Sequence, residues 1–437
     1  MDYQQSLAFM QDLCKFGVNP GLQRIRELLR RLGDPQESIG HYLHVGGTNG
    51  KGSTAAYCES VLRASGRRTG FFSSPHLICH RERYRLDGRW LSEQDFAASI
   101  SEIAPHITAM VAEGWESPTE FELATACALL SFARAKVDWA VLEVGMGGSI
   151  DSTNIIDGDI VIMTNVALDH CRYLGNTVPE IAQVKAGIIK KGSQVVCGVS
   201  GEGEEAVRRA AAACRAPVYW LGRDIAVEQV RSDSLGSRFH WRMGEDRLED
   251  LAISMPGLYQ VDNAALAAAA CRLAGCGSRA IRQGLQSAKW PGRLEIAGQR
   301  PLIVLDGAHN PHGMAALTAS LQALWPDRRK IALVGMLDDK DRQAALALLA
   351  PLLGGAVVTP PPMTQRSEDW RATARYLSGL GVPVLAMEDN RRALQAALAW
   401  TEPEDMLLVT GSLYLLGEIR RWLPVKTDKE ENVCPIG

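Results

Sequence analysis

Short runs of apolar and β-branched residues alternate with Ala-, Leu- and Arg-rich stretches along most of the chain. The runs predict buried strands and the stretches predict helices, which together are typical of βαβ units around a mainly parallel sheet. The predicted strands cover residues 41–47, 139–145, 159–166, 194–199, 301–306, 330–335, 356–360 and 406–411. The pattern therefore predicts an α/β fold.

The alternation is interrupted after two predicted helices, Ala264 to Ala274 and Arg279 to Ala288. The next segment, WPGRLEIAGQRP, is rich in Pro and Gly, which break helices and strands. We place a domain boundary there. We expect one domain over residues 1–295, a smaller Rossmann-like α/β domain over 296–424, and a frayed tail over 425–437, which has few apolar residues to bury.

Composition and charge narrow the class of protein. The chain has 437 residues, 46% of them hydrophobic, which is enough for the cores of two or three domains. Its 47 basic and 50 acidic residues give no basic field for nucleic acid or an anionic membrane. The chain has no apolar run long enough to span a bilayer, and MDYQQSLAFM lacks the basic start of a signal peptide. We expect a cytoplasmic protein whose ten cysteines are reduced core residues.

The segment HYLHVGGTNGKGST places a glycine-rich loop between a predicted strand and a predicted helix. This order is typical of a phosphate-binding loop, in which backbone N–H groups and the helix N-terminus bind phosphate and a lysine, here Lys51, adds a positive charge. The alternative is a strand-to-helix turn that merely needs glycine. Gly52 follows Lys51 where a Ser or Thr commonly ligates magnesium, so a hydroxyl ligand would come from Ser53 or from elsewhere.

The loop GTNGKGS resembles that of the Mur ligase superfamily, and its Gly-Ser ending is similar to the folylpolyglutamate synthase and dihydrofolate synthase branch. Eight further segments are similar to blocks of that family and follow in the same order. They are SSPHL with RERYRLDG, PTEFELATA, EVGMGGSIDSTN, LDHCRYLGNT, KAGII, WPGRLE, LDGAHNPHG and VTGSLYLLGE. The resemblance implies an ATP-binding and pterin-binding domain over 1–295 and a glutamate-ligase domain over 296–424. It implies that the nucleotide is bound by Gly47, Thr48, Asn49, Gly50, Lys51, Gly52 and Ser53.

Two residues lie where ligands gather in a parallel sheet, just beyond the carboxyl ends of strands. Glu143 ends an apolar strand, where a carboxylate is costly to bury unless it is paired or binds a metal, and His170 follows another strand. A histidine alone is more often structural. The resemblance implies that Glu143 and His170, with Ser74, bind two magnesium ions.

The resemblance also implies that Lys185 is carbamylated to N6-carboxylysine, although Val184 replaces the glutamate that commonly precedes it. The alternative is an ordinary solvated helix lysine.

A zinc site is a less favoured interpretation of His76, Cys79 and His80. These residues lack a second pair of ligands at metal spacing, and His76 already belongs to the SPHL block.

The predicted second domain contributes polar residues at a strand end, which fits a site for the incoming amino acid. The resemblance implies that Asp306, His309 and Ser412 help to bind glutamate and the nucleotide. It implies that Arg293 reaches the phosphates, although a linker salt bridge is the alternative. Asn263 matches a nucleotide contact, with Tyr259 in place of a common histidine.

The resemblance places Phe121 and Asp151 on the pterin side, where an aromatic ring could stack on a flat heterocycle. Phe121 could equally be a core residue. Ser149 stands where many relatives have a basic residue.

The resemblance implies an ATP-dependent ligase that adds L-glutamate to dihydropteroate, to the glutamate of a reduced folate, or to both. The acceptor carboxylate would attack the γ-phosphate, and the glutamate amine would then displace phosphate from the acyl phosphate, leaving ADP. We expect a monomer with these small-molecule substrates and no nucleic-acid or membrane partner. The alternatives are a Mur-type peptidoglycan-precursor ligase and a catalytically silent nucleotide-binding homologue. The sequence does not map which acceptor is used.

Overall fold

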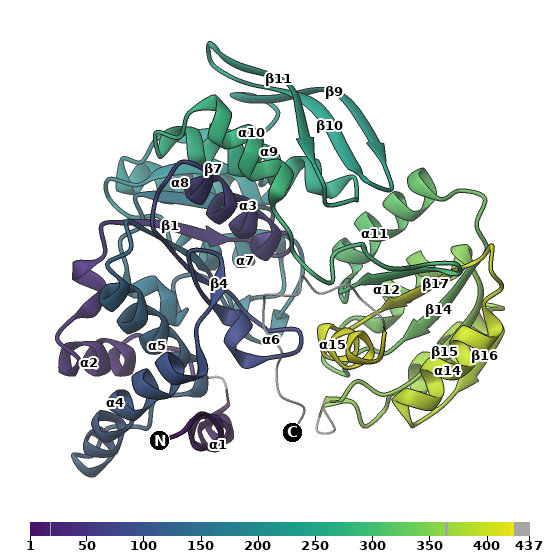
Figure 1. Ribbon diagram of the computed structural model, residues 1–437, viewed down its shortest axis with the longest axis horizontal. Helices are drawn as coiled ribbons and strands as arrows, with labels where there is room; N and C mark the ends of the chain where they lie inside the picture. Colours follow the sequence, from purple (N-terminus) through teal and green to yellow (C-terminus); the bar gives the residue numbers. More distant parts are fainter. Residues whose placement is uncertain (18, 363–365, 424–437) are drawn as a thin grey trace.

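The computed structural model describes residues 1–17, 19–362 and 366–423. It has an N-terminal and a C-terminal lobe, each built around its own sheet (Figure 1). All eight predicted strands are present, with ends that differ by up to three residues from the prediction, and the α/β class is confirmed. The predicted domain division at 295 and 296 lies at the first residue of β12 and stays a prediction, and the predicted tail lies outside the described residues.

The N-terminal sheet has the order β4-β3-β2-β5-β1-β6-β7-β8, parallel except for β3 and β4 at one edge. Its central strand β1 is buried after its first residue, as its continuous apolar sequence predicts. The strands are β1 (His41–Gly46), β2 (Thr69–Phe72), β3 (Tyr84–Leu86), β4 (Arg89–Trp90), β5 (Trp139–Glu143), β6 (Ile160–Met163), β7 (Gln194–Cys197) and β8 (Val218–Trp220).

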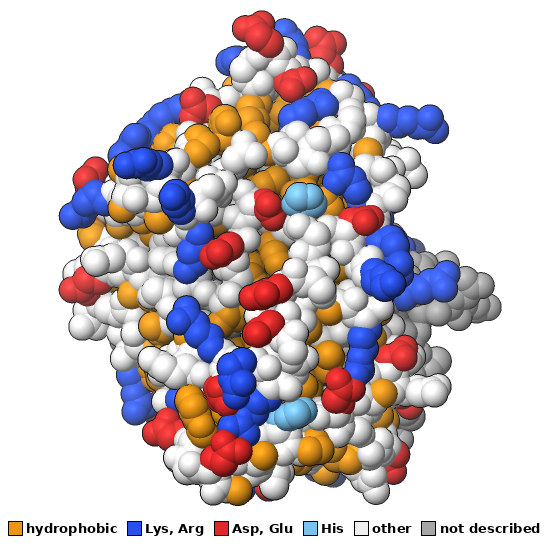
Figure 2. Space-filling view, turned by 90° about the vertical axis from the view of Figure 1, so that its left-hand side faces the viewer, with side chains coloured by type: hydrophobic (Ala, Val, Ile, Leu, Met, Phe, Trp, Pro, Cys, Tyr) orange, Lys and Arg blue, Asp and Glu red, His pale blue; other side chains and the backbone are white. Residues whose placement is uncertain are grey.

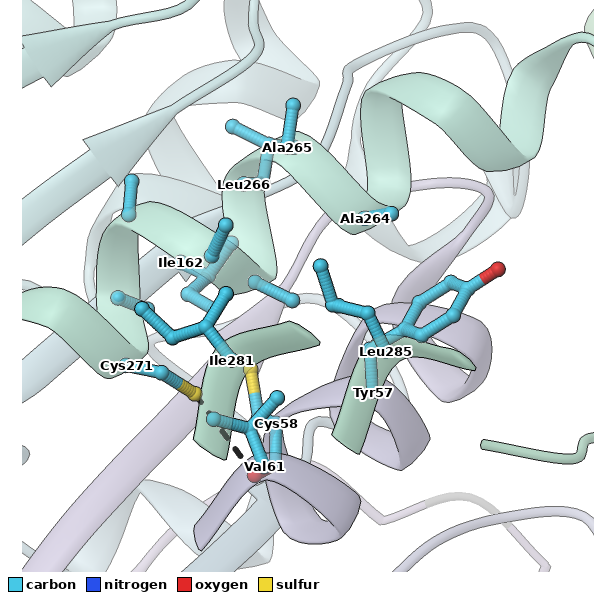
Figure 3. Packing of buried hydrophobic residues seen from close by; sticks show 14 of the residues in the cluster. Tyr57, Cys58, Val61, Ile162, Ala264, Ala265, Leu266, Cys271, Ile281 and Leu285 are labelled. Carbon is cyan, nitrogen blue, oxygen red and sulfur yellow. Dashed lines mark hydrogen bonds between the residues drawn. The ribbon is translucent and has the colours of Figure 1, made fainter. Parts of the chain in front are cut away.

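Helices cover both faces of this sheet. On one face, α3, α9 and α10 bury a shared apolar cluster in which Tyr57 and Val61 of α3 lie against Ile281 and Leu285 of α10 (Figure 3). The other face is covered by α1, α2, α4 and α5 and, beyond them, by α7 and α8. The bounds are α1 (Tyr3–Leu13), α2 (Gln23–Arg31), α3 (Lys51–Ala64), α4 (Glu93–Ala112), α5 (Glu120–Ala135), α6 (Cys171–Leu174), α7 (Val178–Ala186), α8 (Glu204–Cys214), α9 (Tyr259–Leu273) and α10 (Ser278–Ser287).

A second sheet, which was not predicted, is antiparallel and consists of β9 (Ile225–Asp233), β10 (Gly236–Met243) and β11 (Asp246–Ile253). One face of this sheet packs Phe239, Trp241 and other apolar residues into the cluster that contains α9 and α10, while the opposite face carries charged side chains. The strands alternate apolar and charged residues because only one face is buried. None of the three strands is a continuous apolar run, which is why they were not predicted.

The C-terminal sheet has the order β12-β13-β17-β14-β15-β16 and is parallel except for β12. Helices α11 to α13 pack on one face, and α14 and α15 pack on the other. The elements are β12 (Glu295–Gln299), β13 (Leu302–Asp306), β14 (Lys330–Val334), β15 (Leu353–Val358), β16 (Val384–Ala386), β17 (Met406–Thr410), α11 (Pro311–Leu324), α12 (Arg342–Leu349), α13 (Arg371–Gly379), α14 (Asn390–Trp400) and α15 (Leu413–Trp422).

The molecular surface and the helices bear on the charge, membrane and cysteine predictions. Basic and acidic side chains are interspersed on the face shown in Figure 2. Among the described residues, no helix is long and apolar enough to cross a membrane.

The prediction that the cysteines are core residues is wrong for exposed Cys14 and only partly right for Cys171 and Cys214, because these three lie at helix ends near the surface. The other described cysteines are buried, and Cys434 lies outside the described residues.

Candidate active site

The order of the strands places the predicted site residues of the N-terminal lobe side by side. Strands β2, β5, β1 and β6 are adjacent and parallel, so their carboxyl ends share one edge of the sheet. Ser74 follows β2, Glu143 is the last residue of β5, the loop of residues 47–50 follows β1, and His170 follows β6. In the C-terminal lobe, β13, β17 and β14 are likewise adjacent and lead to His309, Ser412 and Lys340.

The loop after β1 is held by the segment that follows β6. Thr48 N donates to Asn165 O (2.8 Å), and Asn49 N donates to Asn165 Oδ1 (2.9 Å). Gly50 has a φ of +82°, in the left-handed region, and a Cβ there would collide with the Asn263 amide. Asn263 of α9 therefore packs against the loop.

Gly52 and Ser53 lie in the first turn of α3, and tertiary contacts explain both residues. A Cβ on Gly52 would lie 2.8 Å from Trp290 Nε1, so the indole leaves no space for a side chain at this position. Ser53 is buried and accepts a hydrogen bond from Gln260 Nε2 (3.3 Å). The residue after Lys51 is glycine because the segment that connects the lobes packs against it.

Glu143 is 5% exposed, and burial raises its pKa to about 7, although Lys51 and Arg293 oppose this rise. Its Oε2 accepts from Ser74 N at 3.4 Å. His170 has a φ of +52°, and burial, followed by Lys340, lowers its pKa to about 4. Its imidazole is therefore neutral at pH 7. Among the described residues, no three His, Cys, Asp or Glu side chains form a metal cluster, and the predicted set has only two of that kind.

Lys185 lies on α7, behind the phosphate loop. It is 4% exposed and its Nζ donates to Gly47 O (2.9 Å). Burial, assisted by Lys51, lowers its pKa to about 7. The alternative of a solvated surface lysine is therefore wrong. Gly148 allows this packing, because a Cβ there would lie 2.5 Å from Lys185 O.

A cavity of about 360 Å³ lies between the two lobes. The predicted site residues that line it are Ser74, Phe121, Asp151, His170, His309 and Ser412. Phe121 is only partly buried, and its ring packs so closely on Gly145 that no Cβ would fit there. Asp151 is buried and accepts hydrogen bonds from Met146 N (2.7 Å) and Thr153 Oγ1 (2.6 Å).

Asp306 holds the start of the C-terminal lobe together. It accepts hydrogen bonds from the Tyr259 hydroxyl (2.8 Å), Leu294 N (2.9 Å) and Ala308 N (2.9 Å). Tyr259, which replaces the histidine common in the resembled family, is therefore a direct partner of Asp306. The positive charge of Arg293 opposes the rise that burial causes in the pKa of both Asp306 and Glu143.

Lys340, from the C-terminal lobe, also lines the cavity and was not predicted. Its Nζ lies 2.6 Å from Asp169 Oδ1, and both side chains are less than a tenth exposed. Asn310 Nδ2 also donates to Asp169 (3.0 Å), and His309 Nε2 lies 3.8 Å away. Burial alone would raise the pKa of Asp169, but Lys340, His170 and His309 together hold it well below its usual range. The available signal was polar sequence, DDKD, soon after a buried strand.

Arg83 and Glu120 also line the cavity and were not predicted. Arg83 Nη1 lies 2.9 Å from Glu120 Oε1, which also contacts His80 Nε2 (3.0 Å). Arg83 Nε donates to His76 Nδ1 (3.0 Å). His76 and His80, which a zinc site would use, therefore contact an arginine and a glutamate.

Comparison with known proteins agrees with this geometry. The Mur ligase middle domain family matches residues 45–271, and the Mur ligase glutamate ligase domain family matches residues 292–413. A probable bifunctional folylpolyglutamate synthase/dihydropteroate synthase of Halobacterium salinarum is 38% identical over 97% of this chain. The chain spans about half of that relative, 52% of its length.

Two further matches cover nearly the whole of both chains. The dihydrofolate synthase/folylpolyglutamate synthase of Bacillus subtilis is 34% identical, over 96% of this chain and 99% of the relative. The solved structure of E. coli FolC in complex with DHPP and ADP has 32% sequence identity and a TM-score of 0.87, covering 97% of each chain. With its two matched domains and its full-length relatives, this chain belongs to the folylpolyglutamate synthase and dihydrofolate synthase family of Mur ligases.

Proposed function

We propose that this protein is an ATP-dependent ligase that adds L-glutamate to dihydropteroate, to the glutamate of a reduced folate, or to both. The observation that carries the proposal is the cavity between the lobes, which is lined by Phe121 and Asp151 of one lobe and by His309 and Ser412 of the other. The names of the relatives and the DHPP and ADP in the E. coli structure support the same reaction.

The phosphates of ATP would be bound by the loop after β1. Its backbone N–H groups and the N-terminus of α3 favour an anion, and Lys51 and Arg293 would neutralise charge on the transferred phosphoryl group. The acceptor carboxylate attacks the γ-phosphorus and ADP leaves. Asn263, packed on Gly50, would keep the loop in its binding conformation.

The residues present fit the predicted magnesium ions. Glu143 is a buried carboxylate that needs a positive partner, and His170 is neutral, which is the form of imidazole that binds a metal. Ser74 lies beside Glu143 and could add its hydroxyl. Bound magnesium would neutralise phosphate charge.

Carbamylation of Lys185 is supported by its environment. An amine reacts with carbon dioxide in its neutral form, and a lysine at the usual pKa has about one neutral amine in 2,500 at pH 7. With its pKa near 7, Lys185 would be neutral in about half of the molecules.

The second half of the reaction would use the C-terminal lobe. His309 and Ser412, at the ends of β13 and β17, would orient glutamate so that its amine attacks the acyl carbon and phosphate leaves. Because both lobes line the cavity, their contact would keep water from the acyl phosphate. The cavity is complete within one chain, so we propose a monomer, acting in the cytoplasm where its substrate ATP is made.

Phosphate release from ATP and magnesium with L-glutamate tests the proposal, with dihydropteroate, tetrahydrofolate and a peptidoglycan nucleotide precursor as separate acceptors. Turnover with both pterins would establish a bifunctional enzyme, and turnover with one would identify the acceptor. Turnover with the peptidoglycan precursor alone, or ATP binding without turnover, would support the two alternatives. Lys51→Ala is the control, and we expect it to abolish turnover without changing the melting temperature.

A further inference from the structure

One wall of the cavity is built from two segments that lie far apart in the sequence. The first contributes Gly17, Asn19 and Pro20, which precede α2, and the second contributes Thr119, Glu120 and Phe121, at the start of α5. The wall requires that these two segments keep a fixed distance, because Phe121 and Asn19 face the same cavity.

Arg24, in the first turn of α2, contacts both segments. It is 7% exposed, and it is absent from the residues that line the cavity. Its Nη2 donates to the carbonyl oxygen of Asn19, its Nη1 donates to Glu116 Oε2 (3.0 Å), and its Nε donates to Glu122 Oε2 (3.1 Å). All three guanidinium nitrogens are therefore used, and each acceptor belongs to one of the two segments or adjoins it.

The acceptors of Arg24 connect further to the wall itself. Glu116 Oε2 also accepts from Asn19 Nδ2 (3.0 Å), so the first segment is held through its backbone and its side chain. Glu122 Oε2 also accepts from Thr119 N (2.8 Å), as part of the capping box that begins α5. The guanidinium thus connects the lining residues Asn19 and Thr119 through contacts of hydrogen-bond length.

The chemistry of the side chain suits this arrangement. A guanidinium is planar and rigid, so its donors fix the relative directions of their acceptors, whereas a lysine ammonium is a point charge on a flexible stem. Burial excludes the water that would otherwise compete for these bonds.

We propose that Arg24 is a positioning residue for the acceptor, which acts by fixing the wall that carries Asn19, Thr119 and Phe121. This inference rests on the proposed function, since it assigns that wall to the pterin acceptor. We expect Arg24 to affect acceptor binding rather than ATP binding, because the loop proposed to bind ATP lies between β1 and α3 and belongs to neither segment of the wall.

Steady-state kinetics of Arg24→Met test the inference. We expect the KM for the pterin acceptor to rise about tenfold or more, because small displacements of a binding group are costly, with the KM for ATP within twofold of wild type. Arg24→Lys keeps the charge without the planar fork and should raise the acceptor KM nearly as much. Arg26→Met, which changes an exposed arginine two residues along the same helix, is the matched control and should behave as wild type.

A second variant guards against a folding defect in Arg24→Met. The Glu116 side chain is 73% exposed, so Glu116→Ala leaves the core intact while removing one partner of both Arg24 and Asn19. We expect it to raise the acceptor KM in the same direction, by about threefold, the effect of losing a modest hydrogen bond. An unchanged acceptor KM in Glu116→Ala and Arg24→Lys, or an equal rise in the KM for ATP, would overturn the inference.

Hydrogen–deuterium exchange separates this inference from the proposed function. Arg24→Met should exchange faster than wild type in peptides that cover residues 17–21 and 117–121, and Arg26→Met should not. Unchanged exchange in both peptides would overturn the inference that Arg24 fixes this wall, whatever the activity. A wild-type protein that uses neither pterin would refute the proposed function instead, and with it the acceptor assignment, while exchange would still report on the contacts of Arg24.

Discussion

Burial leaves two candidate site residues, one acidic and one basic, only partly ionised at pH 7. Glu143 and Lys185 each have a pKa of about 7, the carboxyl raised and the ammonium lowered, and desolvation is the largest cause in both. Each group therefore changes its charge readily when a ligand arrives, which is common at functional sites.

Lys185→Ala tests the predicted carbamate. We expect turnover to fall by roughly 10²-fold to 10³-fold, since a group that positions charge near the phosphates is lost, and a small carboxylic acid such as acetate to restore part of it. Lys191→Ala, which changes an exposed lysine, is the control. A fully active Lys185→Ala that needs no additive would contradict the role of Lys185.

His44, on β1, is linked to Asp151 through the hydroxyl group of Thr153. Its Nε2 lies 2.8 Å from Thr153 Oγ1, which itself donates to Asp151, so the imidazole carries its proton on Nε2. Burial, followed by Lys190, lowers the pKa of His44 to about 3. Below pH 6.5 His44 binds a proton in the unfolded chain but not in the folded protein. The contribution of neutral His44 to the free energy of unfolding is therefore fully present above about pH 6.5 and is lost as pH falls toward 3.

His44→Leu should remove this pH dependence. At pH 7.5 the variant loses a hydrogen bond and should be about 1 kcal/mol less stable than wild type. Each pH unit below 6.5 should cost wild type up to about 1.4 kcal/mol that the variant does not lose, so the variant should be the more stable protein at pH 4.5. Urea unfolding at both pH values measures this, with His106→Leu as control, and parallel pH profiles of His44→Leu and wild type would contradict it.

At the scale of elements, the contact between α3 and the segment after α10 links the phosphate loop to the connection between the lobes. Trp290 lies over Gly52, and its ring also contacts Phe71 edge-on and Arg85. Three residues later, the positive charge of Arg293 lowers the pKa of a carboxyl group in each lobe, Glu143 and Asp306. A change at Gly52 should therefore affect more than the loop.

Gly52→Ala should destabilise the protein by about 1–3 kcal/mol, because the added methyl group forces the indole to move. We expect the KM for ATP to rise as well. A double-mutant cycle with Trp290→Leu isolates the cause, since the cost of Gly52→Ala should be smaller when the indole is absent. An equal cost in both backgrounds, measured by urea unfolding, would show that Trp290 is not responsible.

At the scale of the whole molecule, buried polar contacts join the two lobes beside the cavity. Asp169 of the N-terminal lobe contacts Lys340 and Asn310, and Asn310 is also hydrogen-bonded to Asn49 in the phosphate loop (3.1 Å). Closure of the lobes thus places the ends of the two sheets together and completes the cavity.

Lys340→Met should open the lobes, because it leaves Asp169 as a buried charge without its cation, a change that costs about 3–5 kcal/mol in buried ion pairs. We expect a larger radius of gyration in small-angle X-ray scattering and reduced turnover. The double variant Asp169→Asn, Lys340→Met removes both charges and should recover the closed dimensions. An unchanged radius in Lys340→Met would show that the pair does not hold the lobes together.

The sequence by itself determined the α/β class, the eight strands found by their apolar runs, the glycine-rich loop between β1 and α3 and the polar residues near the strand ends. These features are local, because periodicity and turn residues act within a few positions. Glu143 and Asp306 could be predicted because each is a carboxylate that ends an apolar strand.

Only the tertiary structure decided which strands are neighbours, and therefore that Ser74, Glu143, the phosphate loop and His170 lie side by side. It also decided the contact of Asp169 with Lys340, 171 residues later, and the contacts of Arg24 with Glu116 and Glu122. The alternating pattern of the sheet β9–β11 is likewise explained only by the tertiary structure, because one face of the sheet packs against α9 and α10. Such contacts depend on how the chain closes over long distances, which no local pattern of residues encodes.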